Sequence, residues 1–207
     1  VILVAATSSL WFALNMVILV VPFWVQYALG MTDREVVLLM APLLVVNIVF
    51  FFVFNYIAKR FGKFAAFVTT LASAAITMPL LGLSGYLPFG DTMFQSQLAM
   101  ALVGIPVSGI MVLPPALLAD VIDYDETLTG RRREGIYYGV QAIFQKIAIG
   151  LSIAVATALM YAGGSETPSV WGLRMISASA GAAALVSLAF FARYPIRERD
   201  GKAFVKG

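Results

Sequence analysis

Residues 135–162 read GIYYGVQAIFQKIAIGLSIAVATALMYA, an almost continuous apolar stretch. The hydrocarbon core of a bilayer is about 30 Å thick, and a helix needs about 20 apolar residues to cross it. No proline and no run of charges interrupts the stretch, yet Lys146 lies within it, with Gln141 and Gln145 close by. The stretch therefore predicts a transmembrane helix that carries an ionisable side chain near its middle.

The rest of the 207-residue chain has the same character, because 61% of all residues are hydrophobic, 12% are charged and the mean hydropathy is +0.91. A soluble domain averages about 45–50% apolar and about 25% charged residues. The apolar runs are continuous, whereas barrel strands alternate apolar and polar residues. We therefore expect an all-α membrane protein with a tail at residues 195–207 and six transmembrane helices within 1–194, at residues 1–29, 36–58, 64–87, 94–119, 135–162 and 170–194.

The basic residues predict the orientation of these helices, because cytoplasmic loops are enriched in Lys and Arg. Arg34 and Arg174 fall on one side, whereas eleven of the 14 basic residues fall on the other: Lys59, Arg60, Lys63, Arg131, Arg132, Arg133, Arg193, Arg197, Arg199, Lys202 and Lys206. The basic side, including the tail, is expected to be cytoplasmic. The predicted location is the inner or plasma membrane of the cell, with several passes through the bilayer.

Two residue types are absent. Without cysteine the chain has no disulfide, thiol nucleophile or thiolate metal site, and without histidine it lacks the usual general base and metal ligand. We therefore expect no catalysis, no resident cofactor or metal, and no nucleic-acid partner. Val1 opens directly into an apolar run that lacks the features of a signal peptide. We expect a fragment of a longer protein, with an alternative start codon as the other interpretation.

Lys146 and its polar neighbours follow helical spacing. At about 100° per residue, Tyr138, Gln141, Gln145 and Ser152 fall in one sector, with Lys146 at its edge. A lysine at the centre of a span costs roughly 2.5–3.5 kcal/mol, so such residues usually face water-filled cavities. We expect this stripe to line an aqueous path and the opposite face to meet lipid through Ile136, Val140, Ile147 and Leu151. The alternatives are a lysine satisfied by carbonyls or a neighbouring helix, and a polar stripe that joins helices.

Two other spans carry weaker signals. In the first, Ser8, Trp11 and Asn15 are spaced at i, i+3 and i+7, which suits an apolar plate and an amide against a sugar ring, or ordinary helix packing. In the fourth, proline weakens regular helix, and broken backbone at membrane depth is tolerated where it lines a cavity. A gating helix and a static kink are both open for this span, which contains Gly104, Pro106, Gly109, Pro114 and Pro115.

Residues 120–134 bring opposite charges to the ends of two spans. Carboxylates and guanidinium groups form strong bidentate pairs, so this stretch is expected to form a cytoplasmic gate from Asp120, Asp123, Asp125, Arg131, Arg132 and Arg133. A solvated loop is the alternative. The letters DVIDYDE also resemble an acidic metal motif of prenyl transferases, which would indicate a membrane enzyme acting on lipid. The paired second acidic motif of those enzymes is missing.

Residues 119–146, ADVIDYDETLTGRRREGIYYGVQAIFQK, resemble the hallmark of the glycoside–pentoside–hexuronide:cation symporters, a melibiose-permease-like branch of the major facilitator superfamily. AKRFGK at 58–63 resembles the short basic loop of the wider superfamily. The resemblance implies a twelve-helix transporter of two halves. This chain would provide helices seven to twelve, the C-terminal half, and would need an N-terminal six-helix half as its partner.

The resemblance also implies roles. Lys146 would lie beside the site of the coupling cation, Na⁺ or H⁺, and Gln141 in the sugar pocket, with Tyr138, Gln145, Trp11 and Asn15 as further pocket residues. The cation-binding carboxylates would belong mostly to the other half. The implied function is cation-coupled symport of a sugar or glycoside-like solute. Ala142 stands where sugar-transporting members offer a hydroxyl, so a related carrier of another solute, such as a lysolipid, is the alternative.

Overall fold

Six helices in the computed structural model are long and apolar enough to cross a membrane, which confirms the predicted fold class. The model describes residues 2–162, 166–194, 196–199 and 202–205. The spanning segments are formed by α1 (Ile2–Phe23) with the turn that continues it to Ala28, α2 (Val36–Phe61), α3 (Lys63–Thr77) with its continuation to Leu83, α5 (Thr92–Thr129), α6 (Glu134–Met160) and α7 (Val170–Ala192).

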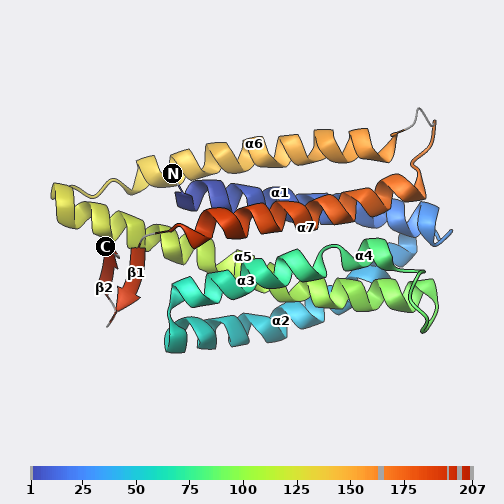
Figure 1. The fold of residues 1–207 in the computed structure, drawn as a ribbon, viewed down its shortest axis with the longest axis horizontal. Helices are drawn as coiled ribbons and strands as arrows, with labels where there is room; N and C mark the ends of the chain where they lie inside the picture. The colour runs from blue at the N-terminus through green and yellow to red at the C-terminus, as the bar shows by residue number, and fades with distance from the viewer. Residues whose placement is uncertain (1, 163–165, 195, 200–201, 206–207) are drawn as a thin grey trace.

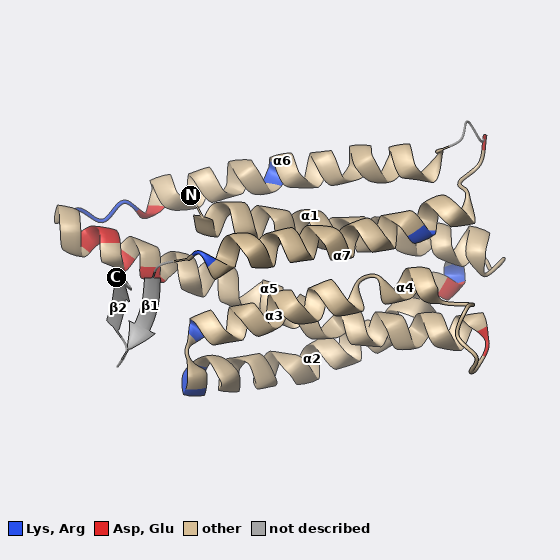
Figure 2. Ribbon diagram, in the orientation of Figure 1, with Lys and Arg blue, Asp and Glu red and all other residues tan. Residues whose placement is uncertain are grey.

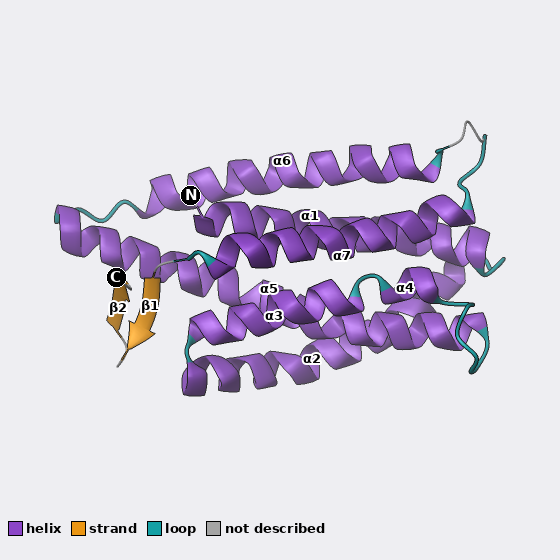
Figure 3. Ribbon diagram, in the orientation of Figure 1, coloured by secondary structure: helices purple, strands orange, loops and turns teal. Residues whose placement is uncertain are grey.

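Short elements extend or connect these helices (Figure 3). A π-helical turn, η1 (Trp24–Ala28), continues α1 after Pro22, a 3-10 turn, η2 (Asp33–Glu35), precedes α2, and α4 (Leu80–Leu83) continues α3 beyond Pro79. The tail contains two short antiparallel strands, β1 (Ile196–Arg199) and β2 (Lys202–Val205), which the apolar pattern did not predict. Both strands lie outside the membrane-length helices.

The six helices form two groups of three. One group is α1, α6 and α7, the other is α2, α3 and α5, and contacts between α3 and α7 join them. Figure 1 shows the two groups as two layers that run along the same long axis. Neighbours in sequence are therefore often apart in space, since α6 packs mainly on α1 and only slightly on α5.

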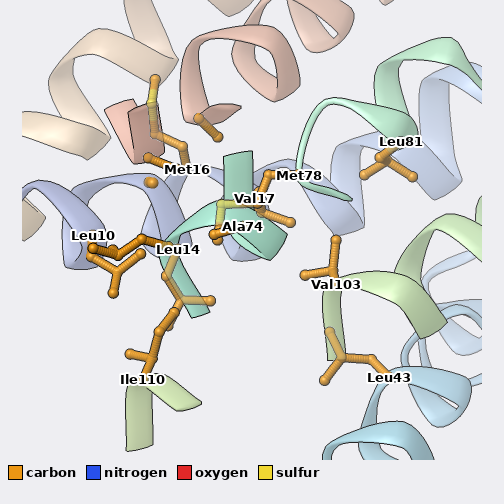
Figure 4. Packing of buried hydrophobic residues seen from close by; sticks show 14 of the residues in the cluster. Leu10, Leu14, Met16, Val17, Leu43, Ala74, Met78, Leu81, Val103 and Ile110 are labelled. Carbon is orange, nitrogen blue, oxygen red and sulfur yellow. The ribbon is translucent and has the colours of Figure 1, made fainter. Parts of the chain in front are cut away.

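The core lies where the two groups meet (Figure 4). Helix α1 packs mainly on α7 and α6, and burial of a large apolar side chain contributes about 1.5–3 kcal/mol relative to exposure in water. The labelled residues include Leu10, Leu14, Met16 and Val17 of α1, Ala74 and Met78 of α3, Leu81 of α4, Leu43 of α2, and Val103 and Ile110 of α5.

Small residues let the helices approach closely. A Cβ atom on Gly104 of α5 would lie 2.5 Å from the carbonyl oxygen of Leu43 in α2. A Cβ on Gly109 would overlap the Thr70 side chain of α3. Membrane helices pack through such positions because lipid provides no hydrophobic drive for association.

The fourth span differs from its prediction. Helix α5 runs for 38 residues to Thr129 and ends at Gly130, whose φ of 66° is left-handed. Asp120, Asp123 and Asp125 therefore lie on a helix and not in a loop, and at 1.5 Å per residue the helix is about 57 Å long, well beyond the bilayer core. The backbone stays helical through Pro106, Pro114 and Pro115, because neighbouring helices hold a proline-containing helix together.

Charged residues gather at the ends of the bundle, as predicted (Figure 2). The α2–α3 junction, the α5–α6 connection and the end of α7 carry most of the described basic residues at one end. Arg34 and Arg174 lie at the opposite end, before α2 and near the start of α7. Lys206 lies outside the described residues.

Candidate functional site

Helix α6 turns one side toward the bundle. Gln141 and Gln145 are partly buried, and Ala148, Ser152 and Ala156 are buried along the same side. The hydroxyl of Ser152 donates to the carbonyl of Ile149 at 2.7 Å within the same helix. The predicted stripe of Gln141, Gln145 and Ser152 thus packs mainly toward α1.

A second side of α6 is apolar and exposed, as the sequence predicted for a lipid-facing surface. Ile136, Val140, Ile147 and Leu151 expose 65%, 42%, 59% and 57% of their surface. Tyr138 is also exposed, at 46%, although its spacing placed it with the glutamines. Its aromatic ring lies at the rim of the polar side and not within it.

Lys146 lies on a third side of α6, midway along the helix. The side chain is exposed, and among the described residues it makes no ion pair or hydrogen bond. On helical spacing, Gly139, Ala142 and Gly150 share this side, and a Cβ added at either glycine would meet nothing within 4 Å. The ammonium group is therefore not satisfied within this six-helix bundle.

Two polar atoms beside α1 and α6 lack partners. The Oε1 atom of Gln141 and the Oγ atom of Ser8 are buried without a hydrogen bond among the described residues. Leaving a buried polar group unpaired costs about 1–3 kcal/mol. Gln141 Oε1 is thus a buried hydrogen-bond acceptor that no described donor satisfies.

The predicted residues of α1 form a partly buried line. Ser8, Trp11 and Asn15 lie on the same side as exposed Ile18. Asn15 Nδ2 donates to the carbonyl of Trp11 at 2.9 Å, so part of its amide is already used within the helix. Among the described residues, no hydrogen bond joins Trp11 or Asn15 to α6.

A cavity of about 320 Å³ lies where α1, α6 and α7 meet. It contains none of the residues predicted to bind solute. Its walls are mostly apolar, from Phe12, Phe144, Ile147 and Leu151, with Ser8 and Ser9 as its polar groups. Its chemistry suits an apolar chain better than a sugar ring.

The charged end of the bundle contains the predicted gate residues, in a different pattern. Arg132 reaches Glu134 at 2.5 Å, Glu126 at 3.1 Å and Asp123 at 3.7 Å, and so joins the end of α5 to the start of α6. The hydrogen bond and charge of Glu134 raise the pKa of Arg132 above its ordinary value. Arg131 and Arg133 have no ion pair within the described part of the chain.

The other two acids of this group contact residues of other types. Asp120 pairs with Lys63 at 2.5 Å and so ties α5 to the start of α3. Asp125 accepts a side-chain hydrogen bond from Tyr137 of α6, while its Oδ2 atom is buried without one. The sequence prediction missed the Lys63–Asp120 pair because 57 residues separate its members.

Arg174, at the end of the bundle opposite the basic residues, contacts aromatic rings. Its guanidinium carbon lies 4.0 Å from the ring centre of Tyr86 and 5.4 Å from that of Trp24. It also donates to the carbonyl of Gly82 at 2.6 Å, and Trp24 donates to Ser96 at 2.9 Å. These cation–π and hydrogen-bond contacts fasten η1, α4 and α5 around α7.

The membrane-length helices place the molecule among helical multi-pass membrane proteins, with one cation, Lys146, exposed midway along α6 and unpaired among the described residues. The chain belongs to the MFS/sugar transport protein family, whose family model matches residues 1–198. The resemblance seen in the sequence is thereby confirmed at the level of the family, and the six helices have the size expected for one half of a major facilitator fold.

Two relatives are symporters. The uncharacterized symporter sll1374 of Synechocystis sp. is 34% identical over 61 residues, which is 30% of this chain and 11% of that protein. Sodium-dependent lysophosphatidylcholine symporter 1-A of Danio rerio is 29% identical over 150 residues, which is 67% of this chain and 27% of that protein. The matched regions thus span about a tenth and about a quarter of these relatives.

Proposed function

We propose that the complete protein is a secondary transporter that carries a sugar or glycoside-like solute together with Na⁺ or H⁺. In this proposal the chain is the C-terminal half, and an N-terminal six-helix half completes the carrier. The observation that carries the proposal is Lys146, an exposed cation midway along α6 with no partner in its own bundle. The symporter relatives support coupling to an ion.

Lys146 would respond to the coupling cation through charge. Two unit charges 4 Å apart interact by about 4 kcal/mol at an effective dielectric constant of 20. The ammonium group would pair with carboxylates of the other half when the cation site is empty and be displaced when the cation binds. Cation and solute would then favour the same conformation, which is what coupling requires.

The solute would bind between the halves near mid-membrane, as is general for such carriers. Gln141 provides an unused buried acceptor, and Gln145 lies one helical turn along the same side. Tyr138, Trp11 and Asn15 would form the rim of the pocket. Donors such as sugar hydroxyl groups would satisfy Gln141 Oε1.

A lysolipid is the second candidate solute. The Danio rerio relative is a lysophosphatidylcholine symporter by name, and it matches 67% of this chain. The apolar cavity of about 320 Å³ at α1, α6 and α7 would suit part of an acyl chain. The same coupling role of Lys146 applies to either solute.

The charged end would serve as the cytoplasmic gate, with the tail on the same side of a plasma or bacterial inner membrane. Arg132 forms ion pairs with three carboxylates at the α5–α6 connection, and Asp120 pairs with Lys63. Arg131 and Arg133 remain available for carboxylates of the other half. Opening would exchange these contacts as one half rocks on the other.

Uptake by the full-length protein in proteoliposomes tests the proposal. Uptake of each solute, from a panel of radiolabelled glycosides and lysophosphatidylcholine, would be measured under an imposed Na⁺ gradient and under an imposed H⁺ gradient. We expect one gradient to drive accumulation of one solute class, and both Lys146→Ala and Gln141→Ala to impair it. Near-normal coupled uptake in both variants would refute the assigned roles.

A further inference from the structure

A second cavity, of about 520 Å³, opens at the basic end of the bundle between α2, the start of α3 and the middle of α5. Lys59, Lys63 and Asn55 provide its polar groups, and Val112 and Leu113 belong to its apolar wall. The cavity is separate from the side of α6 that carries Lys146, and it shares only Lys63 with the proposed cytoplasmic gate.

The charge in this cavity is positive. Lys63 pairs with Asp120 at 2.5 Å, whereas Lys59 is exposed and makes no ion pair among the described residues. The side-chain amide of Asn55 adds two further donors at the same place. The cavity lining thus contains two ammonium groups, of which one is paired with a carboxylate, and the surplus positive charge favours an anion.

Arg60, next to Lys59, points elsewhere. Its guanidinium group donates to the hydroxyl of Tyr56 at 3.3 Å and lies 5.7 Å from the ring centre of Phe61. Arg60 therefore lies along the outer surface of α2 and is not part of the cavity wall. The last turn of α2 thus has two adjacent basic residues, and of these two Lys59 lines the cavity.

The depth of the cavity identifies the kind of anion. Tyr56 and Phe61 are exposed aromatic residues at the last turns of α2, and aromatic residues of this kind gather at membrane–water interfaces. Lysines at this depth meet lipid headgroups, and the apolar wall below them meets the start of acyl chains. A phosphate diester attached to a hydrocarbon chain matches both parts of the cavity.

We propose that this cavity binds the headgroup of an anionic phospholipid, with Lys59, Lys63 and Asn55 donating to its phosphate. The bound lipid would join α2, α3 and α5 at the charged end of the bundle. Asp120 competes with the phosphate for Lys63, so the Lys63–Asp120 pair tunes the affinity of the site. The inference is independent of the solute that the transporter carries.

The test titrates the purified full-length protein with phosphatidylglycerol in neutral detergent and counts bound lipids by native mass spectrometry, with zwitterionic phosphatidylcholine, whose net charge is zero, as the comparison. We expect Lys59→Gln to weaken phosphatidylglycerol binding about fivefold, the typical effect of one basic residue near a lipid surface. Arg60→Gln, the matched control, should change binding less than twofold. Asp120→Asn should strengthen binding several-fold, because it releases Lys63.

Three results would overturn the proposal. Equal weakening by Lys59→Gln and Arg60→Gln would show attraction by surface charge alone. Weaker or unchanged binding in Asp120→Asn would show that Lys63 does not hold the phosphate. Displacement of phosphatidylglycerol by inorganic phosphate at equal concentration would show a site for a free anion and not for a lipid headgroup.

Discussion

At the scale of single residues, the unpaired charge of Lys146 is the feature that the proposed partner half would account for. A lysine at the centre of a lipid-facing helix is unfavourable by roughly 2.5–3.5 kcal/mol, and this bundle offers it no compensating contact among the described residues. Ile147, the next residue, belongs to the apolar exposed side. Helix α6 therefore has an exposed apolar side and a side that carries a cation, less than one turn apart.

Loss of the Lys146 charge should uncouple the two ligands. Coupling free energies of about 1–3 kcal/mol correspond to about 5–150-fold changes in affinity. We expect the coupling cation to raise solute affinity at least fivefold in the wild-type full-length protein and less than twofold in Lys146→Ala. Solute binding measured with and without the cation checks this, and Lys146→Arg, which keeps the charge, should retain most of the effect.

Removal of the Gln141 side chain should weaken solute binding without affecting the bundle. One hydrogen bond is worth about 0.5–1.5 kcal/mol, so the half-saturating solute concentration should rise roughly 2–13-fold in Gln141→Ala. Ser152→Ala is the control on the same side of α6, since its hydroxyl is already bonded to Ile149. Transport kinetics that respond equally to both substitutions would contradict the role of Gln141.

Part of this residue pattern was predictable. Helical spacing alone identified the exposed apolar side of α6 from Ile136 to Leu151, because an uninterrupted helix fixes relative directions. Spacing did not reveal that Asn15 bonds the Trp11 carbonyl, or that Lys63 pairs with Asp120. Those contacts depend on side-chain choices and on the packing of helices that are distant in sequence.

At the scale of elements, the apolar runs predicted the spans but not the true length of α5. Hydropathy falls after residue 119, whereas the backbone stays helical to Thr129. The predicted span ends where the charged residues begin, because charge marks the boundary of the membrane and not the end of the helix. The short tail strands, β1 and β2, were not predicted, because the prediction used continuous apolar runs and the tail has none.

The close contact between α2 and α5 should make the stability of the bundle sensitive to a larger residue at position 104. A methyl group on Gly104 would lie 2.5 Å from the Leu43 carbonyl oxygen, so Gly104→Ala must separate the two helices. Overpacking of this kind costs about 1–3 kcal/mol, and we expect a clearly lower thermal unfolding midpoint. Gly150→Ala, where the added carbon meets nothing within 4 Å, should unfold at or above the wild-type midpoint.

The α5–α6 connection should be insensitive to moderate pH. The pKa of Arg132 is raised, mainly by Glu134, so the favourable pairing is present below the ordinary arginine pKa and is lost only in stronger alkali. We expect limited proteolysis of residues 129–134 to proceed at the same rate from pH 6 to pH 9, apart from the protease's own profile.

Substitution of the arginine should open the same connection. Arg132→Gln removes contacts with three carboxylates, and cleavage should become at least twofold faster. Arg131→Gln is the control, because Arg131 has no ion pair within the described residues. Equal cleavage of both variants would show that Arg132 does not hold the connection.

At the scale of the whole molecule, two helices are only partly covered. Large exposed apolar residues concentrate on α2 and α6, whereas α1 and α5 contribute most of the core. Composition was enough to predict a six-helix membrane protein, because the bilayer imposes helix length and polarity. The two groups of three helices were not predictable from sequence, since contacts such as α3–α7 follow side-chain fit and not chain order.

Aqueous access to position 146 in the complete carrier is the most direct test of the account. In a cysteine-free background of the full-length protein, Lys146→Cys and Ile147→Cys would be treated with a membrane-impermeant thiol reagent. The reagent labels the thiolate, and a cysteine thiol ionises to the thiolate only where water reaches it. We predict rapid labelling at 146, slowed by the coupling cation or the solute, and little labelling at 147. An unreactive position 146, or one that reacts no faster than 147, would contradict the account.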